Sequence, residues 1–206
     1  MTTLTASRYK RPMWMFIILL LVFGLPLVLA WIGWQEQDNF GQGTTNHGQL
    51  LQPPLDLSKL PLDDSLAKAL TPEVWQGRWL MLYVNPQSCT ESCEKNLYYL
   101  RQIRKATGKN SDRIQRAILT FAQAKPDQRL ETGLAKEFAG TLHLVTPTQQ
   151  FAHFVHNTPQ ASTVLQQGGV YLVDPLGNIM MYYPPNTEPM GIFKDLTRLL
   201  KLSHIG

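Results

Sequence analysis

The chain has only two cysteines among its 206 residues, Cys89 and Cys93. A structural zinc site needs four ligands, and the sequence has no second cysteine pair to supply them. The two cysteines are separated by three residues, whereas thioredoxin-type exchange normally uses a separation of two. The pair therefore predicts either a less usual thiol site or an inert disulfide.

Excess basic charge is also small, with 19 Lys and Arg against 15 Asp and Glu and a net charge of +4. The basic residues form no stripe interleaved with aromatic residues, so we expect no nucleic-acid partner. The sequence contains no internal repeat and no low-complexity segment. These absences favour a single ordinary domain with additional segments.

No charged residue lies between Arg11 and Glu36, and residues 13–34 are apolar almost throughout. This length spans a bilayer, and tryptophans lie near both of its ends, as in an aromatic belt. We therefore expect an uncleaved transmembrane anchor over 13–34. The alternative is a secretory signal peptide with a weak cleavage site at Val28-Leu29-Ala30.

Basic residues precede this segment at Arg8, Lys10 and Arg11, and the next one is Lys59. The positive-inside rule then places residues 1–12 in the cytoplasm and the remainder outside. We expect a single-pass protein of the inner (cytoplasmic) membrane with its C-terminal domain in the periplasm. A thiol pair in that compartment can be oxidised.

Residues 35–52 are polar and glycine-rich without periodicity, which predicts a flexible tether with a solvated His47. The globular domain is then expected over 53–206. Within it, residues 79–84 form a continuous apolar run, which is typical of a strand buried on both faces.

This strand runs directly into the cysteine pair. Ser88 with Glu91 forms a capping-box pattern, which predicts Ser88 as the N-cap and Cys89 as the first helical residue. Cys93 would follow one turn later on the same face. Two thiols at the positive end of a helix suit redox chemistry or binding of a soft metal, so Cys89 and Cys93 are the candidate catalytic and metal-binding residues.

The polar residues around the pair predict exposed, reactive thiols rather than core packing, although Glu91 and Glu94 disfavour a thiolate. The alternative is a purely structural role, in which the cysteines pack as small hydrophobic residues or form an inert disulfide. An i, i+4 pair just meets the Cα separation that a disulfide needs. We expect a reversible Cys89–Cys93 disulfide.

The remaining periodicity predicts alternating helices and strands. We expect helices over 63–70, 89–107, 125–139, 146–155 and 187–202, and strands over 114–122 and 142–145. Two more strands flank an Asp-Pro-Leu-Gly turn within 170–183, a clear hairpin signal. This order predicts an α/β thioredoxin-like sandwich behind an N-terminal transmembrane helix.

The strand and cysteine pair within 79–103, and the stretch 170–178 followed by Tyr182-Tyr183-Pro184-Pro185, resemble the Sco-type cytochrome c oxidase assembly proteins. The resemblance covers about residues 75–202 and extends to the single N-terminal anchor. It implies a thioredoxin-like fold and copper bound through Cys89, Cys93 and one histidine. It also implies cytochrome c oxidase subunit II, or another copper or thiol protein, as the partner.

The sequence departs from that family at two places. Sco proteins carry proline within and after the cysteine pair, where this chain has Thr90, Glu91, Ser92 and Glu94. At the position of the metal-binding histidine the chain has Gln166, or in a shifted alignment Gln167. Gln is a poor ligand for Cu(I), which prefers thiolate and imidazole.

A third ligand would then come from another histidine. His153 and His156 are three residues apart and could share a helix face near the cysteines, or could simply be surface histidines. His143 and His204 are weaker candidates.

Two other functions remain open. The first is a membrane-tethered thioredoxin-fold binding module in which the disulfide only staples a loop. The second is a peroxiredoxin-like thiol peroxidase, suggested by Pro86, Thr90 and Cys93 at the spacing of that family. Peroxidase chemistry requires a later arginine, and the sequence has none between Arg129 and Arg198. A thioredoxin would also have a cis-proline where this chain has Gln167-Gly168.

Overall fold

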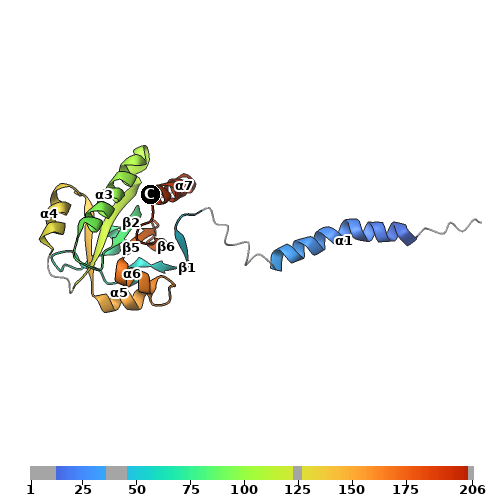
Figure 1. Ribbon diagram of the computed structural model, residues 1–206, viewed down its shortest axis with the longest axis horizontal. Helices are drawn as coiled ribbons and strands as arrows, with labels where there is room; N and C mark the ends of the chain where they lie inside the picture. The colour runs from blue at the N-terminus through green and yellow to red at the C-terminus, as the bar shows by residue number, and fades with distance from the viewer. Residues whose placement is uncertain (1–12, 36–45, 123–126, 204–206) are drawn as a thin grey trace, which may run out of the picture. The chain divides into compact units, whose positions relative to one another are not determined.

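The computed structural model describes residues 13–35, 46–122 and 127–203, which belong to two separate compact units divided after Thr45. The first unit contains helix α1 (Met13–Gln35), with Pro26 inside it (Figure 1). Within the described residues, α1 is the one helix long and apolar enough to cross a membrane. The expected apolar helix over 13–34 is confirmed.

The second unit is built on a six-stranded mixed sheet with the order β1-β6-β5-β2-β3-β4. Strands β2, β3 and β4 are parallel, while β5, β6 and β1 add antiparallel pairs on the other side of β2. Their bounds are β1 Gln49–Asp56, β2 Trp79–Val84, β3 Ile114–Phe121, β4 Thr141–Thr146, β5 Gly169–Val173 and β6 Asn178–Tyr183.

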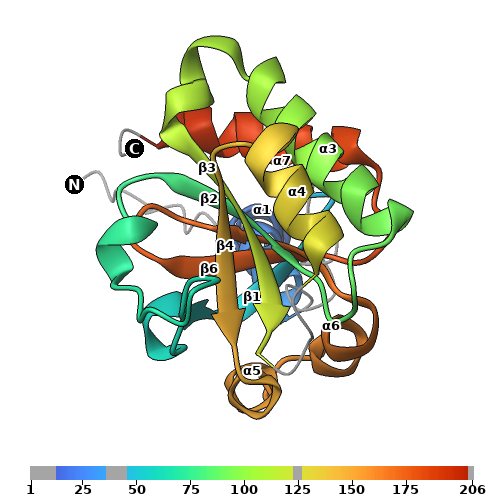
Figure 2. The ribbon, with the colours of Figure 1, turned by 90° about the vertical axis from the view of Figure 1, so that its left-hand side faces the viewer.

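Helices cover both faces of this sheet (Figure 2). One face carries α3 (Glu91–Ala106), α4 (Gln128–Lys136) and α7 (Pro189–Leu202). The other face carries α5 (Thr148–Val155) and α6 (Ala161–Gln167). Three 3-10 turns complete the fold at Leu57–Lys59, Pro72–Val74 and Gly108–Arg113. The predicted α/β sandwich is confirmed.

The central strand β2 shows why the sequence adopts this layering. Its odd-numbered residues Trp79, Met81 and Tyr83 pack under α3 and α7, and its even-numbered residues pack on the opposite face. All six side chains are buried. Because strand side chains alternate between faces, a continuous apolar run is what a sheet covered on both sides requires.

The folded unit begins earlier than the sequence predicts, because residues 46–52 are not part of a tether. Strand β1 pairs with β6, and the segment before it is held by the buried carboxylate of Asp195 in α7. The backbone N–H groups of His47 and Gly48 donate to Asp195 Oδ2 at 2.8 and 3.0 Å. The Tyr183 hydroxyl donates to the same oxygen at 3.1 Å, and His47 Nδ1 lies 3.1 Å from Oδ1. His47 therefore makes a structural contact that the sequence did not predict, while its side chain is 45% exposed, as expected for a solvated residue.

Two further expectations about helices are wrong. Residues 63–70 form a turn rather than a helix, because Asp64 Oδ1 accepts the N–H groups of Leu66 and Lys68 and Asp63 pairs with Val145 of β4. The seven-residue α6 was not predicted, since its N-cap Gln160 makes no side-chain capping bond and the segment is short.

Candidate functional site

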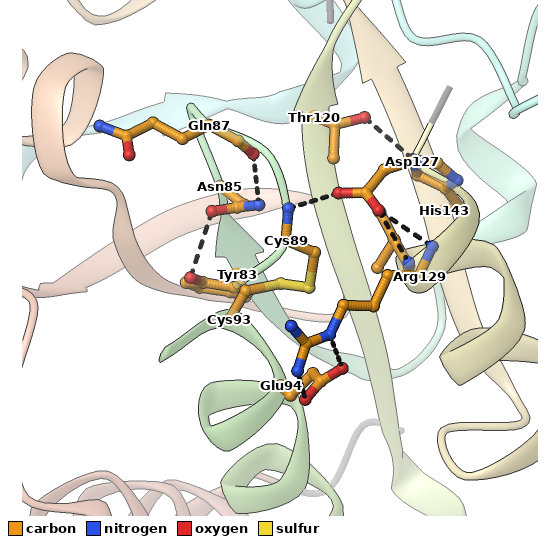
Figure 3. The surroundings of a disulfide bond; sticks show 11 residues. Tyr83, Asn85, Gln87, Cys89, Cys93, Glu94, Thr120, Asp127, Arg129 and His143 are labelled. Atoms are coloured by element: carbon orange, nitrogen blue, oxygen red, sulfur yellow. Dashed lines mark hydrogen bonds and ion pairs between the residues drawn. A yellow bond between two sulfur atoms is a disulfide. The ribbon is translucent and has the colours of Figure 1, made fainter. Parts of the chain in front are cut away.

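The loop after β2 is held by a short chain of polar contacts (Figure 3). The Asn85 N–H donates to Leu119 O at 2.9 Å, which extends the β2–β3 pairing by one residue. The Asn85 side chain donates to Gln87 O at 2.7 Å and accepts from the buried Tyr83 hydroxyl at 3.4 Å. These bonds fix the turn that leads to the cysteines.

Cys89 and Cys93 form a disulfide with Cα atoms 5.1 Å apart (Figure 3). The predicted intramolecular bond is confirmed, while its reversibility stays a prediction. Helix α3 begins at Glu91 with Thr90 as its N-cap, so the expectation that Ser88 caps it and that Cys89 is helical is wrong. The bond thus joins a loop residue to the third residue of the helix.

Both cysteines are buried, with 5% of Cys89 and 2% of Cys93 exposed, contrary to the expectation of exposed thiols. Polar neighbours in the sequence were misleading because they point away, while both sulfurs pack in the core between α3 and the sheet. Cys89 still lines an adjoining pocket of about 310 Å³. Among the described residues, the disulfide therefore borders a pocket on the Cys89 side.

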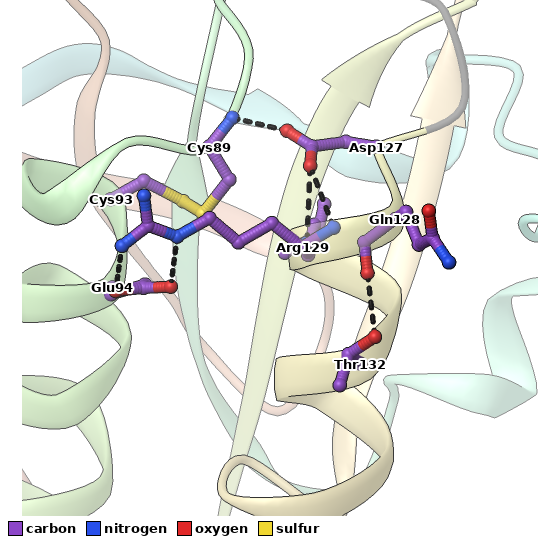
Figure 4. A network of polar contacts seen from close by, with 8 residues as sticks. Cys89, Cys93, Glu94, Asp127, Gln128, Arg129 and Thr132 are labelled. Atoms are coloured by element: carbon purple, nitrogen blue, oxygen red, sulfur yellow. Dashed lines mark hydrogen bonds and ion pairs between the residues drawn. A yellow bond between two sulfur atoms is a disulfide. The ribbon is translucent and has the colours of Figure 1, made fainter.

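Asp127 fixes the backbone at the disulfide (Figure 4). Its Oδ2 accepts the Cys89 N–H at 2.5 Å, and its Oδ1 accepts the N–H groups of Arg129 and Leu130 at 3.0 and 3.2 Å. One carboxylate therefore caps α4 and holds the cysteine loop. This contact, rather than a Ser88 cap, satisfies the Cys89 N–H and explains why the helix starts later.

A second contact links the first turns of α3 and α4. Arg129 donates from Nε and Nη2 to the two carboxylate oxygens of Glu94, at 2.5 and 2.7 Å (Figure 4). This bond lowers the pKa of Glu94 and raises that of Arg129. The geometry is a bidentate fork, which fixes orientation, although both groups lie at the surface where salt screens the pair.

The pocket beside Cys89 is acidic. Four carboxylates line it, and none of its lining residues in the described part of the chain is Lys or Arg. They are Asp63, Asp64, Asp127 and Glu131. These carboxylates favour an approaching cation on the pocket side of Cys89.

His143 of β4 lines the same pocket, with its Nε2 at 2.9 Å from Thr120 Oγ1. Burial lowers the pKa of His143, and the carboxylates of Glu131 and Asp64 only partly oppose that shift. The imidazole is neutral near pH 7 and so has the protonation state that metal coordination requires. From the sequence, His153 and His156 were stronger candidates than His143 for the third metal ligand.

His153 and His156 are not brought to the cysteines. Both are exposed, His153 on α5 and His156 at its C-cap, and the buried residues of α5 pack in the core on the face of the sheet opposite to the disulfide. Their rings stack on each other with centroids 5.0 Å apart. The expectation that they approach the cysteine pair is wrong.

Gln166 is exposed on α6, and only Gln167 faces a hollow, a separate pocket of about 500 Å³ between α3 and the loop before α7. The next residue, Gly168, has φ +77° and ψ −156°, a conformation essentially restricted to glycine. A Cβ there would lie 2.3 Å from Val84 O. Glycine thus lets this segment approach the end of β2 where a thioredoxin would have its cis-proline.

The sequence of the second unit matches a family model described as "Transmembrane-like, thioredoxin-like, C-terminal domain" over residues 79–203, more than half of the chain. The chain belongs to this family. No curated protein sequence matches it.

Solved structures show the same fold. Apo Sco1 from Thermus thermophilus superposes with a TM-score of 0.56 at 16% identity, covering 75% of this chain and 97% of that one. Copper-bound ScoI from Arabidopsis thaliana gives 0.54 at 14% identity, covering 76% and 99%. A putative electron transfer protein from Aquifex aeolicus gives 0.53 at 15% identity, covering 73% and 94%. The chain therefore has the thioredoxin-like fold that Sco proteins share.

Proposed function

We propose that this protein is a membrane-anchored thiol–disulfide exchange protein that acts through Cys89 and Cys93. The observation that carries the proposal is the disulfide itself, which lies between the end of β2 and the first turn of α3 with Cys89 on the wall of a pocket. An inert staple needs no such access. The binding-module alternative predicts a disulfide that resists reductants.

The geometry supports a different role for each sulfur. A thiolate carried by a positively charged partner segment enters the acidic pocket and attacks Cys89 Sγ, the sulfur–sulfur bond breaks, and Cys93 leaves as a thiolate. A second partner thiol then attacks the mixed disulfide and releases Cys89. The partner loses two electrons to form its own disulfide, and the protein gains them as a dithiol.

Cys93 is suited to leave because it is the third residue of α3, where unpaired N–H groups and the helix dipole stabilise a negative sulfur. Glu91 and Glu94 oppose this charge, and the Arg129 guanidinium bound to Glu94 offsets them. Asp127 keeps Cys89 in place through its backbone N–H. Its negative charge also makes Cys89 the less favourable thiolate.

A redox titration of the full chain in an uncharged detergent tests this proposal. We expect glutathione buffers to interconvert the disulfide and dithiol reversibly, measured by alkylation and mass spectrometry. Cys93→Ser should accumulate a mixed disulfide with a small thiol on Cys89, while Cys89→Ser should not form one on Cys93. A disulfide that survives excess dithiothreitol in the folded chain would instead support the binding module.

Copper handling is the second candidate function, because His143 lines the same pocket as Cys89. Among the described residues, no group of three His, Cys, Asp or Glu is already placed to hold a metal. Reduction would free two thiolates, which hold Cu(I), and His143 would be the third ligand. In this reading the cargo is copper for cytochrome c oxidase subunit II or another copper protein.

Anaerobic Cu(I) titration of the reduced chain distinguishes the two functions. We expect binding of one Cu(I) that is lost in Cys89→Ser and in Cys93→Ser. His143→Ala should weaken it more than His156→Ala, a matched substitution of an exposed histidine on the other face of the sheet. If the reduced chain takes up no Cu(I), the exchange function stands alone.

We place the domain outside the cytoplasm on charge asymmetry alone, with residues 1–12 inside and 13–34 as a retained anchor of the inner membrane. A periplasmic location supplies the oxidising conditions under which the disulfide forms. The sequence of the mature N-terminus tests whether the anchor is retained. The side of the membrane on which added protease reaches Lys59 tests the orientation. A mature chain that begins near Trp31 would contradict the anchor.

A further inference from the structure

A second charged pocket, of about 280 Å³, lies at the opposite ends of the two helices that hold the disulfide. The C-terminal half of α3 and the end of α4 form its walls, and β3 forms its floor. Five cations line it against a single carboxylate: Arg101, Arg104, Lys105, Arg116, Lys136 and Glu137. The proposed exchange reaction uses none of these residues.

Arg116 is the unusual member of this group. It is a residue of β3 with only 5% of its surface exposed, in a strand position that elsewhere carries apolar side chains. Its Nη2 donates to Ala139 O at 2.8 Å, but Nε and Nη1 have no hydrogen-bond partner within the described part of the chain. Buried guanidinium groups are normally paired and fully bonded, since an uncompensated buried charge is costly.

The neighbouring cations are held in position, and among the described residues their one ion pair is a long contact from Arg104 to an exposed carboxylate. Arg101 donates to the Glu137 carbonyl at 3.0 Å, and Arg104 donates to the Ile114 carbonyl at 2.9 Å. The nearest carboxylate to Arg104 is the exposed Asp112 at 3.7 Å. Glu137 forms no ion pair within 4 Å among the residues the structure describes. Burial lowers the pKa of Arg116, and the charges of Arg104 and Arg101 lower it further.

We propose that this pocket binds a phosphate-type oxoanion, which supplies negative charge where only Glu137 and the exposed Asp112 oppose the five cations. Guanidinium groups match phosphate oxygens with paired N–H donors, and carbonyl bonds already hold Arg101 and Arg104 in fixed orientations. The volume accommodates one phosphate group. The ligand is either free inorganic phosphate or the phosphate of an anionic phospholipid headgroup, which have the same charged group.

Inorganic phosphate gives the first arm of the test, using the full chain in an uncharged detergent. We expect phosphate to raise the thermal midpoint more than chloride at equal ionic strength, and to slow amide exchange at residues 101–105 and 136–140. Arg101→Gln and Arg116→Met should remove the phosphate-specific shift. Arg78→Gln, a matched substitution of an exposed arginine outside the pocket, should keep it.

Lipid composition gives the second arm. The full chain is placed in phosphate-free nanodiscs of phosphatidylcholine alone or with phosphatidylglycerol, and amide exchange is measured at the same residues. Protection that requires phosphatidylglycerol and is lost in Arg101→Gln identifies a headgroup site. Protection by phosphate in the first arm but not by the lipid identifies a site for the free anion.

Absence of a phosphate-specific effect in the first arm together with no lipid-dependent protection in the second overturns the proposal. An effect of equal size in Arg101→Gln also overturns it, because general ionic strength would then be the cause. Arg116→Met keeps an unbranched apolar stem but lacks the guanidinium group, so the folding of this variant is checked separately by its thermal midpoint. If that variant does not fold, Arg101→Gln alone decides.

Discussion

The two ends of the layer formed by α3 and α4 have opposite charge. At the N-terminal ends the disulfide adjoins a pocket with four carboxylates and no lysine or arginine among its lining residues in the described chain. At the C-terminal ends the pocket is lined by five cations and one carboxylate. Because both helices connect parallel strands, they run in the same direction, and their like ends lie together (Figure 2).

Helix electrostatics explains why this separation is tolerated. Asp127 binds N–H groups at the start of α4, while Arg101 and Arg116 bind carbonyls at its end. Each charge therefore lies where the helix dipole favours it. The same arrangement gives the two pockets opposite preferences, for a cationic partner at the disulfide and for an anion at the far end.

The largest contrast between the two ends is expected from glycine substitutions. At the disulfide end, Gly168→Ala places a Cβ 2.3 Å from Val84 O and 3.0 Å from Pro86 Cδ. At the cationic end, Gly140 also has a positive φ of +79°, but its Cβ would be 3.7 Å from the nearest atom, Arg116 Nη2. We expect Gly168→Ala to cost on the order of 3 kcal/mol of unfolding free energy and Gly140→Ala about 1 kcal/mol. Urea unfolding measures both, and equal losses would show that the contact with β2 is unimportant.

The sequence predicts the layers better than it predicts the site. Residues 79–84 are apolar at every position, and this pattern predicts a doubly covered strand without knowledge of its neighbours. The disulfide follows from the i, i+4 spacing. Local patterns decide such features, and the structure confirms them.

The surroundings of the disulfide depend on contacts between distant residues. The bond from the Cys89 N–H to Asp127 spans 38 residues, and in the sequence Asp127 is only a helix cap. His143 reaches the pocket of Cys89 because β4 pairs with β3, a register that no local pattern specifies. Burial of the cysteines was missed for the same reason, since their polar sequence neighbours point away from the core.

The charge contrast itself is tested by Asp127→Asn. Asparagine can keep the helix cap through its single amide oxygen, but its NH2 group cannot accept the Cys89 N–H, so the variant removes one negative charge together with this contact to the cysteine loop. We expect the wild-type disulfide to react faster with cysteamine than with 3-mercaptopropionate after correction for intrinsic thiol reactivity. The variant should reduce this ratio about 2-fold to 5-fold. Stopped-flow kinetics at low and high salt measure it.

Lys136→Gln is the matched control for that experiment, because it changes one charge at the opposite end of the same helix. In this variant, the ratio of the reaction rates with cysteamine and 3-mercaptopropionate should equal that of the wild type. A change of similar size in both variants would mean that net charge, rather than the acidic pocket, selects the thiol.

A smaller effect, on the stability of the fold, is expected from His143 as the pH falls. Its pKa is lowered in the fold, mainly by burial, so the unfolded chain binds the proton at a higher pH than the folded chain does. Stability should therefore fall as the pH drops below the ordinary value of 6.5, and His143→Gln should lose this part of the dependence. Unfolding midpoints between pH 7.5 and pH 5 provide the measurement. His153→Gln, an exposed control, should behave as the wild type.

The smallest effect is expected from the fork between Glu94 and Arg129, which links the two helices at the disulfide end. The hydrogen bond from Arg129 lowers the pKa of Glu94. The pair therefore stabilises the fold fully above the ordinary pKa of 4.5, and this stabilisation is lost as the pH falls through the lowered pKa. The pair is exposed, and salt should weaken it further. Glu94→Gln should therefore lower the unfolding midpoint slightly at pH 7 and low salt, with the difference from the wild type vanishing in acid. Glu91→Gln, one turn earlier on the same helix and without an ion pair among the described residues, should show no such convergence. If both variants lose the same stability at every pH, the fork does not hold α3 to α4, and Asp127 alone connects α4 to the disulfide.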